Sequence, residues 1–427
     1  MKNKKAMASL ISLVLLVLII GAVALFGKKT ESKVPDSSQS KTTQTEAGIS
    51  WANGIWLNKI NKESIEHISI VNSKQDKNDI DWSYDGFDFS ASDTSVTIYV
   101  TDKLSITGTA ANMFADLTNL KSISGLDLID FSKCINVNGL FKNCKNLEEV
   151  DLESTNFESA EDISSMFEGC EKLKKCKLSN SVTNAKKADS MFNGCISLSE
   201  LSAPKTPMAE SAENMFNGVG DDVGNTVKFL GSLDFSNCKN FNGMFKNAHF
   251  VDYKFLNNAN IIKIESAESM FHSSSIESID MTSWNVENLK TTENMFRNCS
   301  FLHTVNTNGW DCKNLTTCQS MFDKATALIN LTLNWKNVSG IKNTNSMFKE
   351  CSSLKSLDLS CFNDISVTDA TRMFYCLDNV ESIKCTKINA EQSDEMFTYT
   401  SNIKGATPFD ESKVNASMAD TNGYFVQ

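Results

Sequence analysis

The most regular feature of the chain is a pair of large apolar residues that recurs every 23 to 29 residues. The pair is Met-Phe in eleven places and Leu-Phe in one. Such a period predicts twelve similar units that stack on one another, because a unit of this size cannot bury its apolar face alone. The pairs begin at Met113, Leu140, Met166, Met191, Met215, Met244, Met270, Met295, Met321, Met347, Met373 and Met396.

Within a unit, the polar and apolar positions predict a short helix followed by a strand. Four residues before the Met, several units carry Asp, Ser, Thr or Asn, which cap the starts of helices. Two residues after the Phe, several carry Gly or Asn, which end helices. The pattern L-x-x-L-x-L follows, as in 354–359, and its last two apolar positions alternate as in a strand. Met and Phe are then the buried anchors of a helix of one or two turns.

Stacking these units gives an α/β repeat solenoid of about twelve coils over residues 109–397, with a parallel sheet of strands about 4.8 Å apart. The stretch 217–233, where the step is 29, is interpreted as a loop insertion. Residues 51–108 contain alternating segments at 68–70 and 96–100. We expect them to form a β-rich N-terminal cap and 398–427 a C-terminal cap, because solenoid ends expose apolar surface.

The repeat also carries a family resemblance. The sequence 347–359 reads Met-Phe-x-x-Cys-x-x-Leu-x-x-Leu-Asp-Leu and is followed by Ser-Cys-Phe at 360–362 and Val-Thr-Asp at 367–369. It resembles the repeat of the BspA-like leucine-rich-repeat surface proteins over about 109–400, and 62–108 resemble the β-rich segment that precedes their repeats. The resemblance implies an exported, surface-displayed protein of adhesion type, and it supplies no catalytic residues.

The N-terminus is predicted to be a membrane segment. Residues 6–27 form an uncharged apolar stretch of 22 residues, long enough at 1.5 Å per residue to span a bilayer. Lys2, Lys4 and Lys5 precede it and favour a cytoplasmic N-terminus. We favour a signal anchor, which leaves 28–427 extracellular on a single-pass membrane protein; a cleaved signal peptide remains the alternative and would give a secreted protein. Residues 28–50 read as a flexible linker.

Charge and cysteine content narrow the functional classes. The chain has 41 Lys and Arg against 52 Asp and Glu, a formal net charge of −11, which argues against binding nucleic acid. Thirteen cysteines are too few for a disulfide scaffold of this length. No C-x-x-C, G-x-S-x-G or H-E-x-x-H motif occurs, so we expect no catalytic site, no metal and no cofactor.

Several cysteines occupy one repeat position, three residues after the Phe, where other units have Ala248 or Ala325. Interchange of Cys and Ala favours a small buried group. Disulfides Cys144–Cys170 or Cys170–Cys195 remain open as mutually exclusive alternatives, since stacked coils bring such residues within bonding reach. The cysteines at this position are Cys144, Cys170, Cys195, Cys299 and Cys351.

Three other groups are weaker candidates. Asp81, Ser83, Asp85 and Gly86 match the first positions of a calcium loop, but position 12 is Ser92, and a hairpin turn explains the run better. The histidines lie at unrelated repeat phases and read as surface residues. An in-phase aromatic row is expected to fill the core, with a carbohydrate-stacking stripe as the alternative; it consists of Trp284, Trp310, Trp335 and Phe362.

The candidate binding site is a polar row on the sheet. The residue between the last two apolar positions of L-x-x-L-x-L points away from the core, because strand side chains alternate faces. The sequence therefore predicts an interaction protein that binds an unidentified cell-surface or matrix protein or glycan, with a structural envelope or filament component as the alternative. The row contains Asp151, Lys177, Ser202, Asp280, Asn306, Thr332, Asp358 and Lys384, and the ligand-binding residues are predicted to be Asp280, Asn306, Thr332 and Asp358.

Overall fold

The structure is a computed structural model, and it describes residues 49–51, 67–70, 79–80, 96–100, 103–179, 182–202, 206–221, 224–231 and 233–427. All of these belong to one compact unit, Glu46–Gln427. The predicted membrane segment 6–27, nearly all of the linker 28–50 and the calcium-loop candidate 81–92 lie outside the described residues. Within the described part, no helix is long and apolar enough to cross a bilayer.

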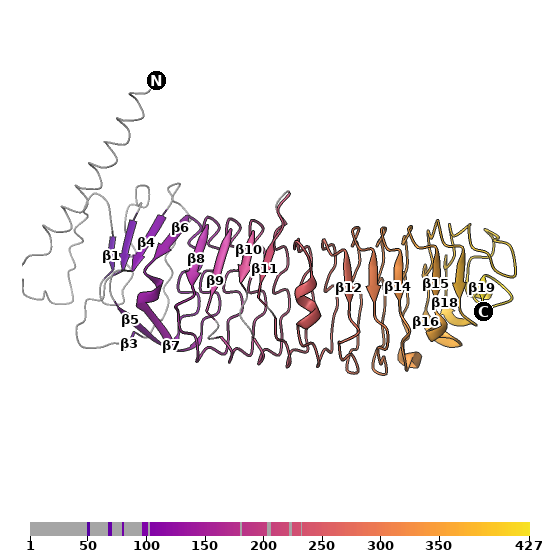
Figure 1. The fold of residues 1–427 in the computed structure, drawn as a ribbon, viewed down its shortest axis with the longest axis horizontal. Coiled ribbons are helices and arrows are strands. Elements are labelled where there is room, and N and C mark those ends of the chain that lie inside the picture. The colour runs from indigo at the N-terminus through magenta and orange to yellow at the C-terminus, as the bar shows by residue number, and fades with distance from the viewer. Residues whose placement is uncertain are drawn as a thin grey trace, which may run out of the picture. The chain divides into compact units, whose positions relative to one another are not determined.

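The predicted parallel sheet is confirmed. The L-x-x-L-x-L segments form short strands that stand side by side in chain order (Figure 1), and every pair is parallel. Together with β11 and β19, which lie outside the pattern, they fall into three sheets: β8 Glu149–Leu152, β9 Lys175–Leu178, β10 Glu200–Ser202 and β11 Lys228–Leu230; β12 Ser278–Asp280, β13 Thr304–Asn306 and β14 Asn330–Thr332; and β15 Ser356–Asp358, β17 Ser382–Lys384 and β19 Phe425–Val426.

A second parallel ladder runs along the solenoid. It continues across the points at which the first ladder is divided into separate sheets. It is made of single-residue bridges between consecutive coils, and they begin at the end of β7 Ile129–Asn136. Near the C-terminal end it continues into the pair β16 Ile365–Asp369 and β18 Ile388–Gln392. The bridged residues are Asn136, Asp162, Lys187, Ser211, Asn240, Ser266, Thr291, Thr317, Asn343 and Asp369.

The predicted helix in each unit is wrong. The described residues contain no α-helix, and the Met-Phe pairs lie in turns. The residues interpreted as helix caps are bridged residues of the second ladder. The side chains of five of the seven accept a hydrogen bond from the backbone N–H two residues on, which closes a tight turn instead of a helix. This bond is made by Asp162, Thr291, Thr317, Asn343 and Asp369. The Ser211 and Ser266 hydroxyls instead donate to Asp189 and Asn242.

Two left-handed residues in each unit are what prevent a helix. In all twelve units, φ is positive at the residue before the Met or Leu and at the second residue after the Phe. The left-handed conformation predicted for the Gly and Asn residues after the Phe is therefore confirmed, for example at Gly169 and Asn298. The sequence reasoning missed the first of the two positions, and without it the chain would continue as a helix.

Short 3-10 helices occur at a few other places in the described chain. They do not repeat from coil to coil, so the solenoid is a parallel β-solenoid with little helix. They are η2 Leu126–Leu128, η3 Lys254–Asn258, η4 Val338–Gly340, η5 Ser360–Phe362 and η6 Ala416–Met418.

The predicted role of Phe as a core anchor is confirmed. The twelve repeat Phe side chains, from Phe114 to Phe397, form one column whose eleven successive ring contacts have centroid distances of 5.2 to 5.9 Å and interplanar angles of 2 to 20°. The N–H of every repeat Phe except the last donates to the Met or Leu carbonyl of the next coil, as from Phe322 to Met347 at 2.9 Å, and that of Phe397 donates to the Val414 carbonyl. Eleven such steps give a solenoid of about 11 turns.

The described strands at the N-terminal side continue the solenoid's sheets. β1 Ile49–Trp51, β2 His67–Ile70 and β4 Val96–Val100 pair in parallel with one another and with β6 Leu120–Ser124. β3 Asp79–Ile80 and β5 Leu104–Thr109 pair in the same way with β7. The segment expected to be β-rich therefore contains strands, and they extend the repeat's own ladders.

The C-terminal residues pack onto the last coil. β19 pairs with β17, and the ring of Tyr424 meets that of Phe397 edge-on at 5.2 Å. Tyr424 and Phe425 are buried. These contacts cover the end of the Phe column, as a cap would.

The stretch 217–233 differs from the prediction of a plain loop. It contains β11, which pairs in register with β10. The next coil has no strand at this position, and η3 occupies the place between β11 and β12 (Figure 1). This interruption divides the first ladder into an N-terminal sheet, β8–β11, and a C-terminal group, β12–β17.

Candidate functional site

The predicted polar row lies where the sequence places it. Asp280, Asn306 and Thr332 are in register on β12, β13 and β14, and Asp358 is in register with Lys384 on the next sheet. All are exposed except Asn306, which is half-buried. The structure thus brings the four predicted ligand-binding residues onto one outward face.

Three of these residues also have a structural task that the sequence reasoning missed. The Oδ1 atoms of Asp280, Asn306 and Asp358 accept hydrogen bonds from the backbone N–H two residues on, at 3.0 to 3.1 Å. Asp358 accepts a further one from the Ser360 hydroxyl at 2.6 Å, and these bonds lower its pKa. The expectation that the row could be changed to Ala without affecting folding is therefore too simple, because these side chains close the turn after each strand.

The N-terminal part of the same row is engaged in ion pairs. The Lys177 Nζ lies 3.2 Å from Asp151 Oδ2 and 3.9 Å from Glu153 Oε2. On β13 and β14 the row residues Asn306 and Thr332 are uncharged, so they form no ion pair. At the end of the row, Lys384 Nζ lies 3.9 Å from Asp358 Oδ2.

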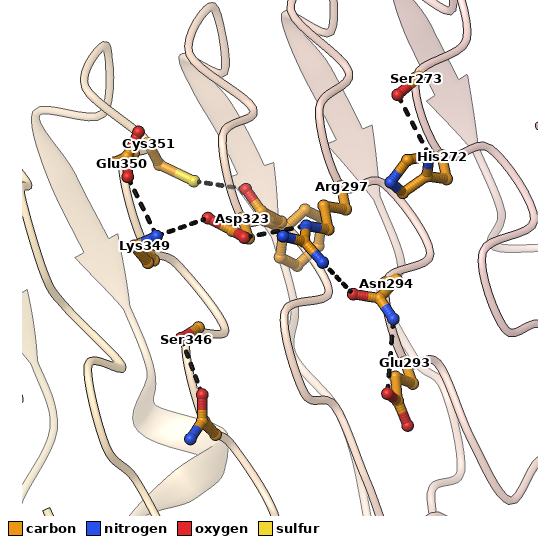
Figure 2. Close-up of polar contacts among 12 residues, drawn as sticks. His272, Ser273, Glu293, Asn294, Arg297, Asp323, Ser346, Lys349, Glu350 and Cys351 are labelled. Carbon is orange, nitrogen blue, oxygen red and sulfur yellow. Dashed lines mark hydrogen bonds and ion pairs between the residues drawn. The ribbon is translucent and has the colours of Figure 1, made fainter. Parts of the chain in front are cut away.

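A buried carboxylate that the sequence did not single out lies on the turn side of the coils. Asp323, directly after the repeat Phe322, has a side chain only 3% exposed. Its Oδ2 lies 3.1 Å from Arg297 Nε and its Oδ1 3.8 Å from Lys349 Nζ, and Figure 2 shows it between these two cations. Burial raises the pKa of Asp323, while the cations oppose that rise. This arrangement is a network of ion pairs that joins three consecutive coils.

The repeat cysteines are buried, as predicted, and their thiols are hydrogen-bonded. Each Sγ donates to the carbonyl of the repeat Phe in the preceding coil, as from Cys351 to Phe322 at 3.0 Å. Burial raises the pKa of Cys170 and of Cys299 to about 12. A nucleophilic or metal-binding thiol needs a lowered pKa, so these groups are poor candidates for either role. The same bond is made by Cys144, Cys170, Cys195 and Cys299.

The aromatic row fills the interior, as expected. Trp284, Trp310, Trp335 and Phe362 are at most 6% exposed, and the rings of Trp310 and Trp335 stack at 5.7 Å. The indole N–H of Trp335 donates to the Thr307 hydroxyl at 2.8 Å. Burial rules out the alternative of a carbohydrate-stacking stripe.

The three histidines whose side chains the structure describes have different surroundings. His303 is exposed, His272 is half-buried beside Ser273, and His249 lies 3.7 Å from Asp221. Burial, together with the nearby cations Lys246 and Arg297, lowers the pKa of His272. Within the residues that the structure describes, no group of three or more His, Cys, Asp or Glu side chains could hold a metal ion.

Comparison with known families identifies the repeat. Residues 108–225, 221–335 and 301–412 each match the family described as "Mycoplasma protein of unknown function, DUF285". The matches together span 108–412, so the chain belongs to this family. The same repeats carry the resemblance to the BspA-like leucine-rich-repeat surface proteins, which is confirmed.

Among solved structures, the chain is similar to a leucine-rich repeat protein from Bacteroides ovatus, with 17% identity, a TM-score of 0.46, and coverage of 88% of this chain and 94% of that one. It is also similar to a leucine-rich cell surface protein from Faecalibacterium prausnitzii, with 15% identity, a TM-score of 0.34, and coverage of 83% and 86%. No curated protein matches the chain significantly.

Proposed function

We propose that this chain is an exported, surface-displayed interaction protein that binds a macromolecular partner through the outward face of β12–β15. The observation that carries the proposal is the outward row of Asp280, Asn306 and Thr332, in register on consecutive strands, with Asp280 and Thr332 exposed and Asn306 half-buried. Solenoids commonly offer such extended faces to partners. A row of this kind presents hydrogen-bonding groups at a regular spacing of about 4.8 Å.

The neighbouring row on the same face supports this assignment. Ser278, Thr304 and Asn330 are in register on β12–β14, and Ser356 is in register with Ser382 on β15 and β17. Hydroxyl and amide groups lose little on desolvation compared with charges. A partner protein or glycan can therefore displace water from this face at low cost.

Display at the cell surface rests on the sequence. The apolar segment 6–27 supports export with residues 28–427 extracellular, either tethered as a single-pass membrane protein or released after cleavage. The name of the Faecalibacterium relative, a cell surface protein, agrees with this location. The proposed function requires no catalytic residue, metal or cofactor, and the alternative is a structural envelope or filament component that has no separate ligand.

The test starts from a screen of the full-length chain, in detergent, against immobilised glycans and matrix proteins. Any ligand found is then titrated against Thr332→Lys, which places a long charged side chain in the middle of the row without removing a turn bond. The matched control is Ser202→Lys, at the same row position on β10. We expect Thr332→Lys to weaken binding at least tenfold and Ser202→Lys to leave it unchanged.

A second pair of variants separates charge from turn closure. Asp280→Asn with Asp358→Asn keeps an oxygen acceptor for the turn and removes both charges, whereas the same positions changed to Ala also lose the turn bond. If Thr332→Lys and the double Asn variant stay folded and keep full affinity for an identified ligand, the row is not the binding site.

A further inference from the structure

The residue types at the two left-handed positions of each coil differ between the earlier coils and those near the C-terminus. Of the twelve residues before the Met or Leu, ten are Gly, Asn or Ser, and the last two are Arg372 and Glu395. Of the twelve second residues after the Phe, the first eight are Asp, Asn, Gly or Ser. The last four are Lys324, Glu350, Cys376 and Tyr399.

These exceptions are unfavourable for folding. Left-handed backbone is easiest for Gly, because in every other residue the Cβ comes close to the following carbonyl oxygen; Asn and Asp tolerate it because their short polar side chains can hydrogen-bond locally. Arg, Glu and Tyr residues at such positions persist only where the surrounding structure compensates, and they often mark functional surfaces. Only the last two coils, with Arg372 and Cys376 and with Glu395 and Tyr399, lack Gly, Asn, Asp and Ser at both positions.

Four strained residues and two neighbours form one surface cluster on three consecutive coils, in which Arg372, Glu395 and Tyr399 are exposed and the others half-buried. We call it the C-terminal turn edge: Lys349, Glu350, Arg372, Tyr375, Glu395 and Tyr399. Arg372 pairs with Glu395, and the two side chains are 50% and 46% exposed. The Tyr375 ring meets that of Tyr399 edge-on at 5.4 Å. Tyr399 is 62% exposed, an unusual amount for a large aromatic side chain.

Two cations lie over the ring of Tyr375 in this cluster. Lys349 Nζ is 5.9 Å and Arg372 Cζ 5.8 Å from the centroid of Tyr375. Lys349 also lies 3.1 Å from Glu350 and 3.8 Å from Asp323 (Figure 2). Both cations are thus already neutralised by carboxylates of the same surface, which disfavours an anionic ligand.

We propose that the C-terminal turn edge is a self-association surface that packs against the same surface of a second copy of this chain. Two positive and two negative side chains give it no net charge, while the whole chain carries −11 and repels its copies elsewhere. Around a twofold axis a patch with both signs is self-complementary. Arg372 of each copy then faces Glu395 of the other, and the Tyr399 rings pack at the centre.

The size of the surface sets the expected strength. Three coils span two strand spacings, about 10 Å, so the interface is smaller than that of a stable dimer. Tyr and Arg are the residue types that contribute most to small interfaces. We expect reversible association in the micromolar range or weaker, which becomes substantial when copies are crowded on one surface.

A charge-exchange experiment tests the pairing. Full-length wild type, Arg372→Glu and Glu395→Arg are each measured by sedimentation equilibrium in density-matched detergent. We expect the wild type to associate as its concentration rises to about 100 µM and each variant to stay monomeric, because the two facing positions then carry like charges. An equimolar mixture of the two variants should associate again, at least as tightly as the wild type, since opposite charges face each other at both positions.

A second test replaces one of the unfavourable left-handed residues. Tyr399→Asn installs a residue type found at this position in earlier coils, so the variant should melt no lower than the wild type while its association weakens at least tenfold. The matched control Lys324→Asn changes the same position in another coil and should leave association unchanged. A wild type that remains monomeric, an unreactive mixture, or association that survives Tyr399→Asn would each overturn the proposal; association that survives would place the contact elsewhere, including the N-terminal apolar segment.

Discussion

The N-terminal sheet β8–β11 and the C-terminal strands β12–β17 share one backbone geometry but present different faces to solvent. On the N-terminal sheet, Glu149, Lys175, Glu200 and Lys228 are in register, so the charge alternates from strand to strand. The equivalent row on β12–β14 is Ser278, Thr304 and Asn330. One face is a self-neutralising charge ladder, and the other is a ladder of small hydrogen-bonding groups.

The difference between the two faces shows which outward residues the fold needs and which can vary without affecting the fold. In an alternating charge ladder each strand lies between strands of the opposite charge. If a strand paired with the coil after next, like charges would lie side by side, so the ladder favours the observed pairing of consecutive coils. The strands β12–β14 keep the same parallel register without charges at Ser278, Thr304 and Asn330, so these three residues are not needed to align the coils. Positions that the fold leaves free are where a binding surface can be built.

The largest effect should come from the interior, which the two regions have in common. Phe192 and Phe322 are fully buried and lie between stacked Phe neighbours in the N-terminal and C-terminal regions. We expect Phe192→Ala and Phe322→Ala each to cost about 3–5 kcal/mol of unfolding free energy, because each opens a cavity in the column. Chemical denaturation measures this.

The exposed Phe301 supplies the control for these variants. Its side chain is 56% exposed, so Phe301→Ala should change the free energy of unfolding by less than about 0.5 kcal/mol. A cost that is large in one region and absent in the other would show that the Phe column does not stabilise both regions alike.

The thiols probe the same interior without a mutation. Eleven of the thirteen cysteines are buried, and only Cys361 and Cys376 are half-exposed. We expect iodoacetamide at pH 8 to label those two in the native protein and the others at least about a hundredfold more slowly, since labelling requires local unfolding and a raised pKa disfavours the thiolate. Mass spectrometry with and without denaturant gives the count.

Two outcomes of the labelling experiment would contradict this expectation. Fast native labelling of Cys170 but not Cys351 would show that the interior of the N-terminal region opens more easily. Four or more intact disulfides in the unreduced, denatured protein would contradict the role of these cysteines as core fillers.

The parallel stacking was predictable because the repeat period, the alternation in L-x-x-L-x-L and the buried Met-Phe pair all depend on local apolar spacing. The turn was not, because Asp, Asn, Ser and Thr favour both helix caps and tight turns that bend away from a helix. Ser346 before Met347 decides between them through its positive φ, and Ser is only a weak signal for that conformation.

A smaller effect is expected from breaking the charge ladder. Lys175→Glu places a third carboxylate between Glu149 and Glu200 on adjacent strands. We expect a loss of about 1 kcal/mol in unfolding free energy at low salt, from two new like-charge contacts, and recovery of part of it at high salt. The measurement is denaturant unfolding at two ionic strengths.

The matched substitution is Thr304→Glu, between Ser278 and Asn330. It should cost less than about 0.5 kcal/mol, because no neighbour in the row is charged. Equal costs at both positions would mean that strand propensity, and not charge register, distinguishes the two faces.

The candidate site was predictable in position but not in function. Alternation along the strand places Asp358 outward, and the structure agrees. What the pattern could not reveal is the turn bond that Asp358 accepts from Ser360, because outward direction says nothing about where a short side chain finds its partner. The Asp323 network was missed for a related reason: its partners Arg297 and Lys349 are 26 residues away in either direction, and only the exact stacking of coils joins them.

The smallest expected effect compares Asp151 on the N-terminal sheet with Asp358 on the C-terminal one. Both carboxylates close the turn after their strand and have lowered pKa values. The main cause of the lowered pKa at Asp151 is the hydrogen bond from the Glu153 N–H, with Lys177 adding to it, and at Asp358 it is the hydrogen bond from the Ser360 hydroxyl.

A folded pKa below the unfolded value of about 4 means that the stabilisation is complete above pH 4 and is lost as the pH falls through the folded pKa. We expect Asp151→Asn and Asp358→Asn each to remove a small part of the acid sensitivity of unfolding while keeping the turn, and the corresponding Ala variants to cost a further ~0.5 kcal/mol at pH 7. Because the lysine beside Asp151 is closer, at 3.2 Å against 3.9 Å for Lys384 beside Asp358, the effect of Asp151→Asn should shrink more with added salt. Thermal unfolding from pH 3 to 7 at low and high salt measures both variants. An equal salt response would show that the ion pairs of the N-terminal face contribute no more than those of the C-terminal face.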